Sequence, residues 1–555
     1  MEKQNRDARS AGAAAKEAVV TEARDPGVSM VGDVVDSERD MSLRDAFRLW
    51  PKAILFAFII SLTIIMEGYD TALMSNFFAY PSFVARYGDE VDDKGNPLVS
   101  ARWQTIVING AYVGSIIGVF LNGFITDWLG YRKTMIVTML FMIGANFIPF
   151  FSTSLPMFLA GELIQGLPWG IFSTLGVSYA ADICPIQLRG YMTSWVNICW
   201  VIGQLIAVGI LNAFIKHPGE WSYRIPFAVQ WVWPVPIIIV SLFAPESPWW
   251  LMRRRQHAEA RVAVAKLLTP RSDIDFDLDN HMEIMRLTMR FEQKATSGPT
   301  SSYLDCFRGA NLRRTEISSM AWLTPAFCGA PFMGYGIQYM IQAGLNPSDS
   351  FSLSLGQTGI SLAGCLIAWW IMTVAGRRTM YLAGLSTMTL ILVTIGFLGI
   401  APATNHAASW AVGGLILLIV FVFQLTVGPS CYTVVAEAPS AQLRIKTVAV
   451  ARVAYSAGGF VISALMPQMI GHNAWNWGAK GGFFWAGVSF LFLVWTWFRL
   501  PETKGLTTSD INLLFEHKVP TRGFTREAAD YLRPKLQDDA SSTETVDLTS
   551  RLASV

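Results

Sequence analysis

The stretch AADICPIQLR (180–189) returns as VAEAPSAQLR (435–444), with an acid and an arginine at matching positions 255 residues apart. Two further landmarks recur in the same order, at offsets of 256 and 246 residues: PESPWW (245–250) with PETKGL (501–506), and GYRK (130–133) with GRRT (376–379). Three matched landmarks in one order indicate that the chain is built from two similar halves. Whatever fold one half adopts, the other half is therefore expected to adopt as well.

The composition is that of a protein that crosses a membrane many times. Of the 555 residues, 52% are hydrophobic and only 15% are charged, whereas soluble domains average about 25% charged residues. The net charge of +2 is too small to indicate a nucleic-acid partner. The six cysteines show no CxxC spacing, and the sequence has no phosphate loop, metal cluster or nucleophile elbow. We therefore expect no metal or other cofactor, no enzymatic activity and no ATP-driven pumping.

Twelve apolar stretches are long enough to cross the bilayer, which takes about 20 residues as a helix. They lie near residues 53–74, 104–126, 134–152, 156–181, 191–215, 226–244, 317–340, 350–374, 379–400, 408–436, 446–470 and 480–499. We expect one six-helix bundle at 51–245 and a second at 316–500, joined by a polar linker at 246–315 with short amphipathic helices. The polar segments 1–50 and 501–555 are predicted to be disordered tails.

Positive charge predicts the orientation, because cytoplasmic loops collect Lys and Arg. The short loops on one side of the predicted membrane carry Arg132, Lys133, Arg189, Arg377, Arg378, Arg444 and Lys446. Short loops on the other side hold little beyond Lys216, Arg224 and Lys480. We therefore expect both termini and the linker in the cytoplasm. Since six spans are an even number, both halves have the same orientation, which is the parallel-repeat plan of transporters with a central site.

These landmarks resemble the signatures of the major facilitator superfamily. NGFITDWLGYRK (122–133) is similar to its loop motif between spans two and three, and PESPWWLMRRR (245–255) and PETKGL (501–506) resemble the motifs that end each half of its sugar porters. GYDTALM (68–74) and GELIQGLPWG (161–170) look most like fungal α-glucoside, or maltose-type, permeases, which are proton symporters. The resemblance implies an all-α membrane protein with the major facilitator fold: twelve transmembrane helices in two six-helix bundles related by a parallel repeat.

Charged residues at the cytoplasmic helix ends are candidates for a gate. Acids and bases there are expected to form ion pairs that hold the two halves together while the site faces outward. Each exposed pair contributes at most about 1 kcal/mol, so the pairs would have to act together. The candidates are Asp127, Arg132, Lys133, Asp182, Arg189, Glu246, Arg377, Arg378, Glu437, Arg444 and Glu502. The alternative interpretation is ordinary topogenic charge with solvated loop acids.

Four charged residues fall inside predicted spans, where each costs about 2.5–3.5 kcal/mol on insertion scales. They are Glu67 and Asp70 in span one, Glu162 in span four and Arg452 in span eleven. The two acids of span one are three residues apart and share a helix face, which we expect to point into the bundle. Because three acids face one base, at least one carboxyl group is expected to hold a proton during part of the transport cycle. The alternative is a static structural network.

The family resemblance gives the coupling role to one of these acids. Asp70 matches the aspartate of the span-one GYD motif, which is the proton-coupling candidate in the family. Many sugar porters pair that aspartate with an arginine in span four, but this chain has Glu162 there, as maltose-type permeases do. Arg452 is then the candidate countercharge, contributed by the other half.

A neutral sugar is recognised by amide and hydroxyl groups and by aromatic faces. Gln204 matches the span-five glutamine that contacts sugar in the family, and Asn197 lies two turns earlier on roughly the same face. Where many sugar porters carry two glutamines in span seven, this chain has Pro325 and Ala326, so a simple hexose pocket is not expected. The other candidates, each of which could instead be a packing residue, are Tyr335, Gln338, Tyr339, Tyr432 and Tyr455.

Together these features predict a secondary active transporter of the plasma membrane that takes up an α-glucoside such as maltose with a proton, by alternating access. It is expected to act as a monomer whose partners are the sugar, the proton and the lipid bilayer. Two alternatives stay open: a transporter of a hexose, a polyol or another small polar metabolite, and a sugar sensor that does not transport. The short tails and the intramembrane acids favour transport.

Overall fold

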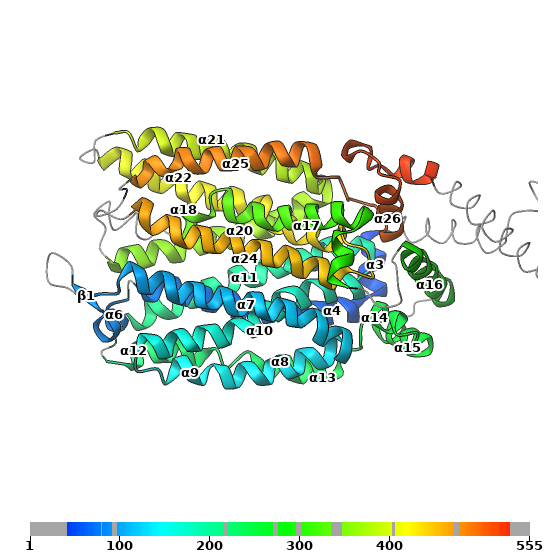
Figure 1. The fold of residues 1–555 in the computed structure, drawn as a ribbon, viewed down its shortest axis with the longest axis horizontal. Coiled ribbons are helices and arrows are strands. Elements are labelled where there is room, and N and C mark those ends of the chain that lie inside the picture. Colours follow the sequence, from blue (N-terminus) through cyan, green and yellow to red (C-terminus); the bar gives the residue numbers. More distant parts are fainter. Residues whose placement is uncertain are drawn as a thin grey trace, which may run out of the picture.

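The structure is a computed structural model that describes residues 41–532, except 79, 92–96, 216, 218, 270–275, 296–301, 335–346, 402–405, 471–474 and 476. Two bundles of long helices lie side by side with their axes roughly parallel (Figure 1). The N-terminal half of the chain forms one bundle, and the C-terminal half, in green to orange, forms the other.

The N-terminal bundle contains the first six predicted spans, three of which are split into two helices. Prolines begin several of these helices, where the missing N–H group leaves no hydrogen bond unmade. The helices are α4 (Pro51–Ser61) with α5 (Thr63–Phe77), α7 (Ala101–Leu129), α8 (Tyr131–Ala145) with α9 (Phe147–Phe150), α10 (Leu155–Ile183), α11 (Ile186–Phe214), and α12 (Trp221–Val229) with α13 (Pro234–Phe243).

The C-terminal bundle contains the other six predicted spans. Its helices are α17 (Gly309–Phe327), α18 (Ala330–Gly334), α20 (Pro347–Val374), α21 (Arg377–Leu398), α22 (His406–Leu425), α23 (Val427–Glu437), α24 (Arg444–Ile470) and α25 (Gly481–Arg499), the last preceded by the 3-10 turn η2 (Gly478–Lys480).

Ten helical stretches among the described residues are long and apolar enough to cross a membrane. They correspond to all the predicted spans except the fourth and the seventh. The fourth is α10, whose 29 residues are long enough, but which carries the polar side chains of Glu162 and Gln165 at buried positions. The seventh begins as α17 and α18, and its remainder lies outside the described residues.

Glycines allow the helices of the N-terminal bundle to approach each other closely. A Cβ atom on Gly114 of α7 would lie 2.1 Å from the carbonyl oxygen of Leu163 in α10. A Cβ atom on Gly68 of α5 would likewise lie 2.3 Å from the carbonyl oxygen of Trp200 in α11. Any larger residue at these positions would force the two backbones apart. Small residues at membrane helix interfaces generally allow this close approach.

Short elements gather at the two ends of the bundles (Figure 1). At one end, here called the linker end, lie α3 (Leu43–Leu49), α14 (Pro248–Arg253), α15 (His257–Leu267), α16 (Leu278–Ala295) and α26 (Thr508–Glu516). The chain also forms the 3-10 turns η1 (Tyr303–Phe307) and η3 (Thr521–Gly523). At the other end lie α6 (Pro81–Tyr87) and the antiparallel pair β1 (Glu90–Val91) and β2 (Pro97–Leu98).

Parts of the two predicted tails are folded in the structure. The expectation of a disordered tail from residue 501 onward does not hold for 501–532, because α26 buries Ile511, Leu514 and Phe515. These three apolar residues follow the spacing of one helix face, a signal that the overall polarity of the segment conceals. Helix α3 similarly lies within the predicted N-terminal tail.

Candidate functional site

A buried ion pair joins the two halves of the molecule. Glu67 of α5 and Arg452 of α24 form a salt bridge although 385 positions separate them in the chain. The guanidinium group also lies 4.7 Å from the ring centroid of Tyr455 and 5.5 Å from that of Trp322. Such cation–π contacts stabilise a desolvated cation by about 2 kcal/mol. Arg452 is thus held by one carboxylate and a cage of aromatic rings.

Asp70 lies one turn from Glu67 but has a different partner. Its Oδ1 atom accepts a hydrogen bond of 2.8 Å from Nε2 of Gln230, which follows α12. Asp70 is only 3% exposed, and within the described part of the chain it forms no ion pair. The Oε1 atom of Gln230 has no partner among the described residues and is available to accept a hydrogen bond. An amide that both donates and accepts suits a carboxyl group in either protonation state.

Glu162 of α10 is the most isolated of the four intramembrane charges. It is fully buried, and neither of its carboxyl oxygens has a hydrogen-bond partner among the residues described. Asp70 is near enough to repel it when both groups are ionised. A buried carboxyl group without a counter-charge is more stable in its neutral form. Within the described structure, Glu162 is therefore a buried acid with no counter-charge of its own.

Amide side chains from opposite halves meet between α11 and α22. The Nδ2 atom of Asn197 donates a hydrogen bond of 2.9 Å to Oε1 of Gln424 and lies 3.3 Å from Sγ of Cys365. Gln204, two turns further along α11, is partly exposed, and no hydrogen bond of its side chain is found within the described residues. Asn197 therefore links the halves, while Gln204 has free donors and an acceptor.

The aromatic sugar-site candidates surround the same arginine as the ion pair. The ring of Tyr432 packs edge-on against Trp322, with centroids 5.8 Å apart, and Tyr455 lies directly beneath Arg452. Both tyrosines therefore help to enclose the cation. The candidates Tyr335, Gln338 and Tyr339 lie outside the described residues.

Two further ion pairs join the halves at the linker end. Asp182 and Arg444 form a salt bridge whose side chains are each 1% exposed, and Ser247 Oγ donates a hydrogen bond of 2.7 Å to the other Asp182 oxygen. Lys446 and Asp127 form the second pair, in which the carboxylate is 41% exposed. Both pairs connect the N-terminal bundle to α24 or the residues that begin it.

Glu246 and Glu502 bind backbone groups instead of basic side chains. Glu246 accepts hydrogen bonds from the first N–H groups of α8, at 2.7 Å from Tyr131 and 3.3 Å from Arg132. Glu502 accepts them from the start of α21, at 2.9 Å from Arg377 N and 3.2 Å from Arg378 N. A carboxylate at this position accepts hydrogen bonds from the first N–H groups of the helix, which have no partner within the helix. It also stabilises the positive end of the helix dipole. Burial raises the pKa of Glu246, and these N–H groups partly offset the rise.

Several other gate candidates stay within one half. Arg377 pairs with Glu437 at 3.2 Å inside the C-terminal bundle, and Arg378 donates a hydrogen bond to the Trp497 carbonyl oxygen. Arg132 and Lys133 form no side-chain ion pair within the described ranges. Local motifs place these charges at helix ends, but only the packing of the bundles decides which of them face the other half.

Comparison with known proteins identifies the chain's family. Residues 56–515 match the family described as "Sugar (and other) transporter". The chain belongs to the sugar transporter family. The transporter is 36% identical, over 519 residues, to the general alpha-glucoside permease of Saccharomyces cerevisiae, covering 93% of this chain and 84% of that protein. It is 36% identical to the maltose permease MAL31 of the same organism over 498 residues, covering 89% of this chain and 81% of the permease.

A solved structure confirms the fold of the transporter. The proton:xylose symporter XylE, bound to 6-bromo-6-deoxy-D-glucose, superposes with a TM-score of 0.72 and 20% identity, covering 84% of this chain and all of that one. The predicted major facilitator fold and the resemblance to α-glucoside permeases are therefore confirmed. The chain is a multi-pass membrane transporter and not an enzyme.

Four side chains make polar contacts inside the transporter that the sequence did not predict. Gln230 and Gln424 are isolated amides inside predicted apolar spans, a signal that could have singled them out. Cys365 carries no such signal, because cysteine is an ordinary buried residue. Lys446 stands among the bases that predict the orientation, and its pairing with Asp127 across the halves is visible only in the structure.

Proposed function

We propose that this transporter takes up an α-glucoside such as maltose together with a proton, by alternating access between the two bundles. The observation that carries the proposal is the set of three buried acids, Glu67, Asp70 and Glu162, with Arg452 as the one basic partner that pairs with them directly in the described structure. The names of the relatives, an alpha-glucoside permease and a maltose permease, support the class of sugar.

The proton would be held by the carboxyl groups that lack an arginine. Glu67 is neutralised by Arg452, which leaves Asp70 and Glu162 as neighbouring acids that repel each other when both are charged. A proton on one of them removes that repulsion and the cost of a second buried charge. The acids would release the proton when the bundles tilt and the cavity meets cytoplasmic water.

The sugar would bind between the bundles near the amide groups. Asn197 and Gln424 already join α11 to α22, so a sugar hydroxyl inserted there would replace their mutual hydrogen bond. Gln204 offers a second amide on the same face of α11. Sugar binding would thereby connect the halves through the ligand, which couples occupancy of the site to movement of the bundles.

The ion pairs at the linker end would close the cytoplasmic side. Asp182–Arg444 and Asp127–Lys446 would have to separate before the sugar could leave toward the cytoplasm. We propose that the linker end, with 246–315 and both termini, faces the cytoplasm, and that the protein works as a monomer in the plasma membrane. The excess of Lys and Arg at these helix ends supports that orientation.

Uptake into proteoliposomes tests the proposal. Purified protein would be reconstituted and given radiolabelled maltose, sucrose or glucose, with and without an inward proton gradient. We expect maltose to accumulate above its external concentration only when the gradient is present. Equilibration that ignores the gradient would contradict proton coupling, and accumulation of glucose in place of maltose would contradict the α-glucoside assignment.

A further inference from the structure

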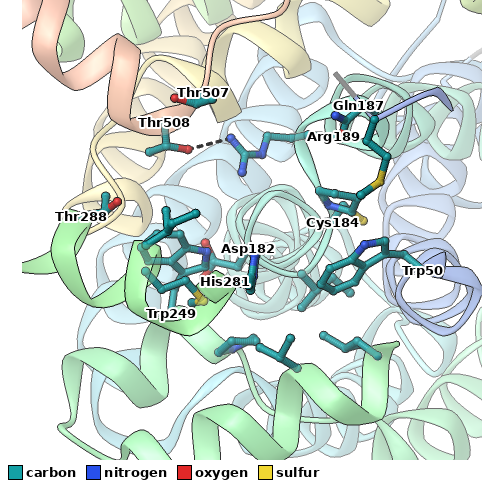
Figure 2. A pocket seen from close by; sticks show the side chains of 18 of the residues that line it. Trp50, Asp182, Cys184, Gln187, Arg189, Trp249, His281, Thr288, Thr507 and Thr508 are labelled. Carbon is teal, nitrogen blue, oxygen red and sulfur yellow. Dashed lines mark hydrogen bonds between the residues drawn. The ribbon is translucent and has the colours of Figure 1, made fainter. Parts of the chain in front are cut away.

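The two halves meet along a seam between α7 and α24, which lie side by side (Figure 1). At the linker end of this seam, Asp127 of α7 pairs with Lys446 of α24. A second contact joins the N-terminal half to the segment that follows the C-terminal bundle. There, Nη1 of Arg189 donates a hydrogen bond of 2.9 Å to Thr508, at the start of α26 (Figure 2). The halves are therefore in contact at the linker end.

The 3-10 turn η1, which ends the linker, is attached to the C-terminal half. A capping box of Ser302 and Asp305 closes the turn. Cys306 is fully buried. Its carbonyl oxygen accepts a hydrogen bond of 2.7 Å from Thr315 of α17, and its Sγ atom lies 3.7 Å from Oγ1 of Thr447 in α24. The backbone of η1 is thus fixed against α17 and α24.

Tyr303 extends from this turn to the N-terminal half. Its hydroxyl group donates a hydrogen bond of 3.1 Å to the carbonyl oxygen of Phe120 in α7. Its ring lies against the rings of Phe120 and Phe124, with centroids 5.6 Å apart in both cases. Aromatic rings at this separation attract each other, and the hydroxyl group adds a directional bond. Tyr303 therefore connects η1 to α7 across the seam.

Gly123 makes room for the Tyr303 hydroxyl group on the surface of α7. A Cβ atom at position 123 would overlap this hydroxyl group, and its three nearest atoms all belong to Tyr303. Because glycine weakens a helix compared with alanine, the contact gives a physical reason for glycine here. Gly123 lies one turn before Asp127 on the same helix face, and Thr447 directly follows Lys446. Tyr303 and the ion pair hence cross the same part of the seam.

The ion pair beside Tyr303 is too exposed to hold the seam by itself. The Asp127 side chain is 41% exposed, and exposed ion pairs contribute little to stability. Salt also screens such a pair, whereas it does not screen an aromatic contact. The tyrosine therefore supplies the part of the closure that depends least on salt.

We propose that η1 is a strap that holds the linker end closed, and that Tyr303 is its contact with the N-terminal half. The turn would stay on α17 and α24, while Tyr303 would leave Gly123 each time the linker end opens. The inference rests on the proposed alternating access and adds to it a gating residue that carries no charge. Because Tyr303 contacts α7 in the closed state, weakening this contact would shift the population toward the open state.

Distances between spin labels on the two halves test the strap without any transport. Lys133→Cys at the start of α8 and Thr379→Cys at the start of α21 place labels at exposed positions of the linker end, while the six native cysteines are buried. In nanodiscs without sugar, Tyr303→Ala should at least double the fraction of long distances. Tyr303→Phe, which loses only the hydroxyl group, should raise that fraction less. An unchanged distribution in Tyr303→Ala would overturn the proposal.

Variants on the α7 side of the contact keep the test decisive if Tyr303→Ala does not fold. Gly123→Val displaces the tyrosine and should lengthen the distances as Tyr303→Ala does. Gly144→Val, where nothing lies within 4 Å of a new Cβ atom, should not, and neither should Leu304→Ala, which changes a neighbouring side chain that is 64% exposed. Because Tyr303→Ala and Gly123→Val break one contact, the double variant should go no further than either single variant. Equal distributions for Gly123→Val and Gly144→Val would reject the contact.

Sugar uptake is a separate readout. External sugar binds while the linker end is closed, so a smaller closed fraction in Tyr303→Ala should raise the KM for sugar severalfold. Longer distances with an unchanged KM would contradict the proposed transport cycle but not the strap. Unchanged distances would contradict the strap but not the transport cycle.

Discussion

Asp182, the third residue of AADICPIQLR, and Arg444, the last residue of the repeated segment VAEAPSAQLR, form a salt bridge between the halves with each side chain 1% exposed. The acid of one copy therefore pairs with the arginine of the other. Arg189, the counterpart of Arg444, instead donates a hydrogen bond to Thr508. The repeat is symmetric in sequence, but the contacts between its copies are not.

Removing one partner of this pair should strongly destabilise the closed linker end. Arg444→Gln leaves the Asp182 carboxylate buried, at a cost of about 3–5 kcal/mol. We expect a lower melting temperature in detergent and faster labelling of a cysteine introduced at the linker end. The control is Arg261→Gln, which breaks the exposed pair with Asp279 and should cost less than about 1 kcal/mol. Equal melting temperatures for the two variants would contradict the prediction.

Asp70→Asn should separate sugar binding from proton coupling. The amide keeps the size of the side chain and a hydrogen bond to Gln230, but it cannot take up a proton. Gradient-driven accumulation of sugar should disappear, whereas exchange of internal for external sugar should continue. Glu90→Gln, which removes an exposed acid at the opposite end, should accumulate sugar normally. Accumulation by Asp70→Asn at the wild-type level would refute the assigned role.

Arg452 should not tolerate replacement by lysine. Its planar guanidinium group combines the Glu67 pair with aromatic contacts to Tyr455 and Trp322, and a lysine reproduces this geometry poorly. We expect Arg452→Lys to reduce active uptake at least tenfold. The double variant Glu67→Gln/Arg452→Gln, which leaves no buried charge unpaired, should be more stable than Arg452→Gln alone. Size-exclusion profiles and uptake rates measure both effects, and a less stable double variant would argue against the pair.

Asn197 and Gln424 should be coupled in sugar binding. Loss of a hydrogen bond costs about 1 kcal/mol, so Asn197→Ala and Gln424→Ala should each raise the KM for sugar about fivefold. Because the two amides share one hydrogen bond, the double variant should raise KM less than the product of the single effects. A double-mutant cycle on uptake measures this coupling, and fully multiplicative effects would show that the residues act independently.

Gly114→Ala should impair folding, whereas Gly413→Ala should not. The new Cβ atom at position 114 would lie 2.1 Å from the Leu163 carbonyl oxygen, while nothing lies within 4 Å of a Cβ atom at position 413. Overpacking of this kind costs about 1–3 kcal/mol. The yield of monodisperse protein and its melting temperature should fall for the first variant alone, and equal behaviour of the two would contradict the close packing of α7 on α10.

Hydropathy and the internal repeat were enough to predict twelve spans, their order and the division into two halves. Hydropathy and repeated motifs are local properties, and a 20-residue apolar stretch has few alternatives in a membrane. Local sequence also singles out Glu67, Asp70, Glu162 and Arg452 as functional candidates. A charged side chain inside a span costs free energy of insertion in whatever direction it points.

The identity of the charged groups that meet depends on the tertiary packing. Arg452 pairs with Glu67 and not with Asp70, and Glu246 caps α8 instead of pairing with a base. These outcomes depend on how each helix is rotated and how the bundles pack, which a residue's neighbours in the chain do not specify.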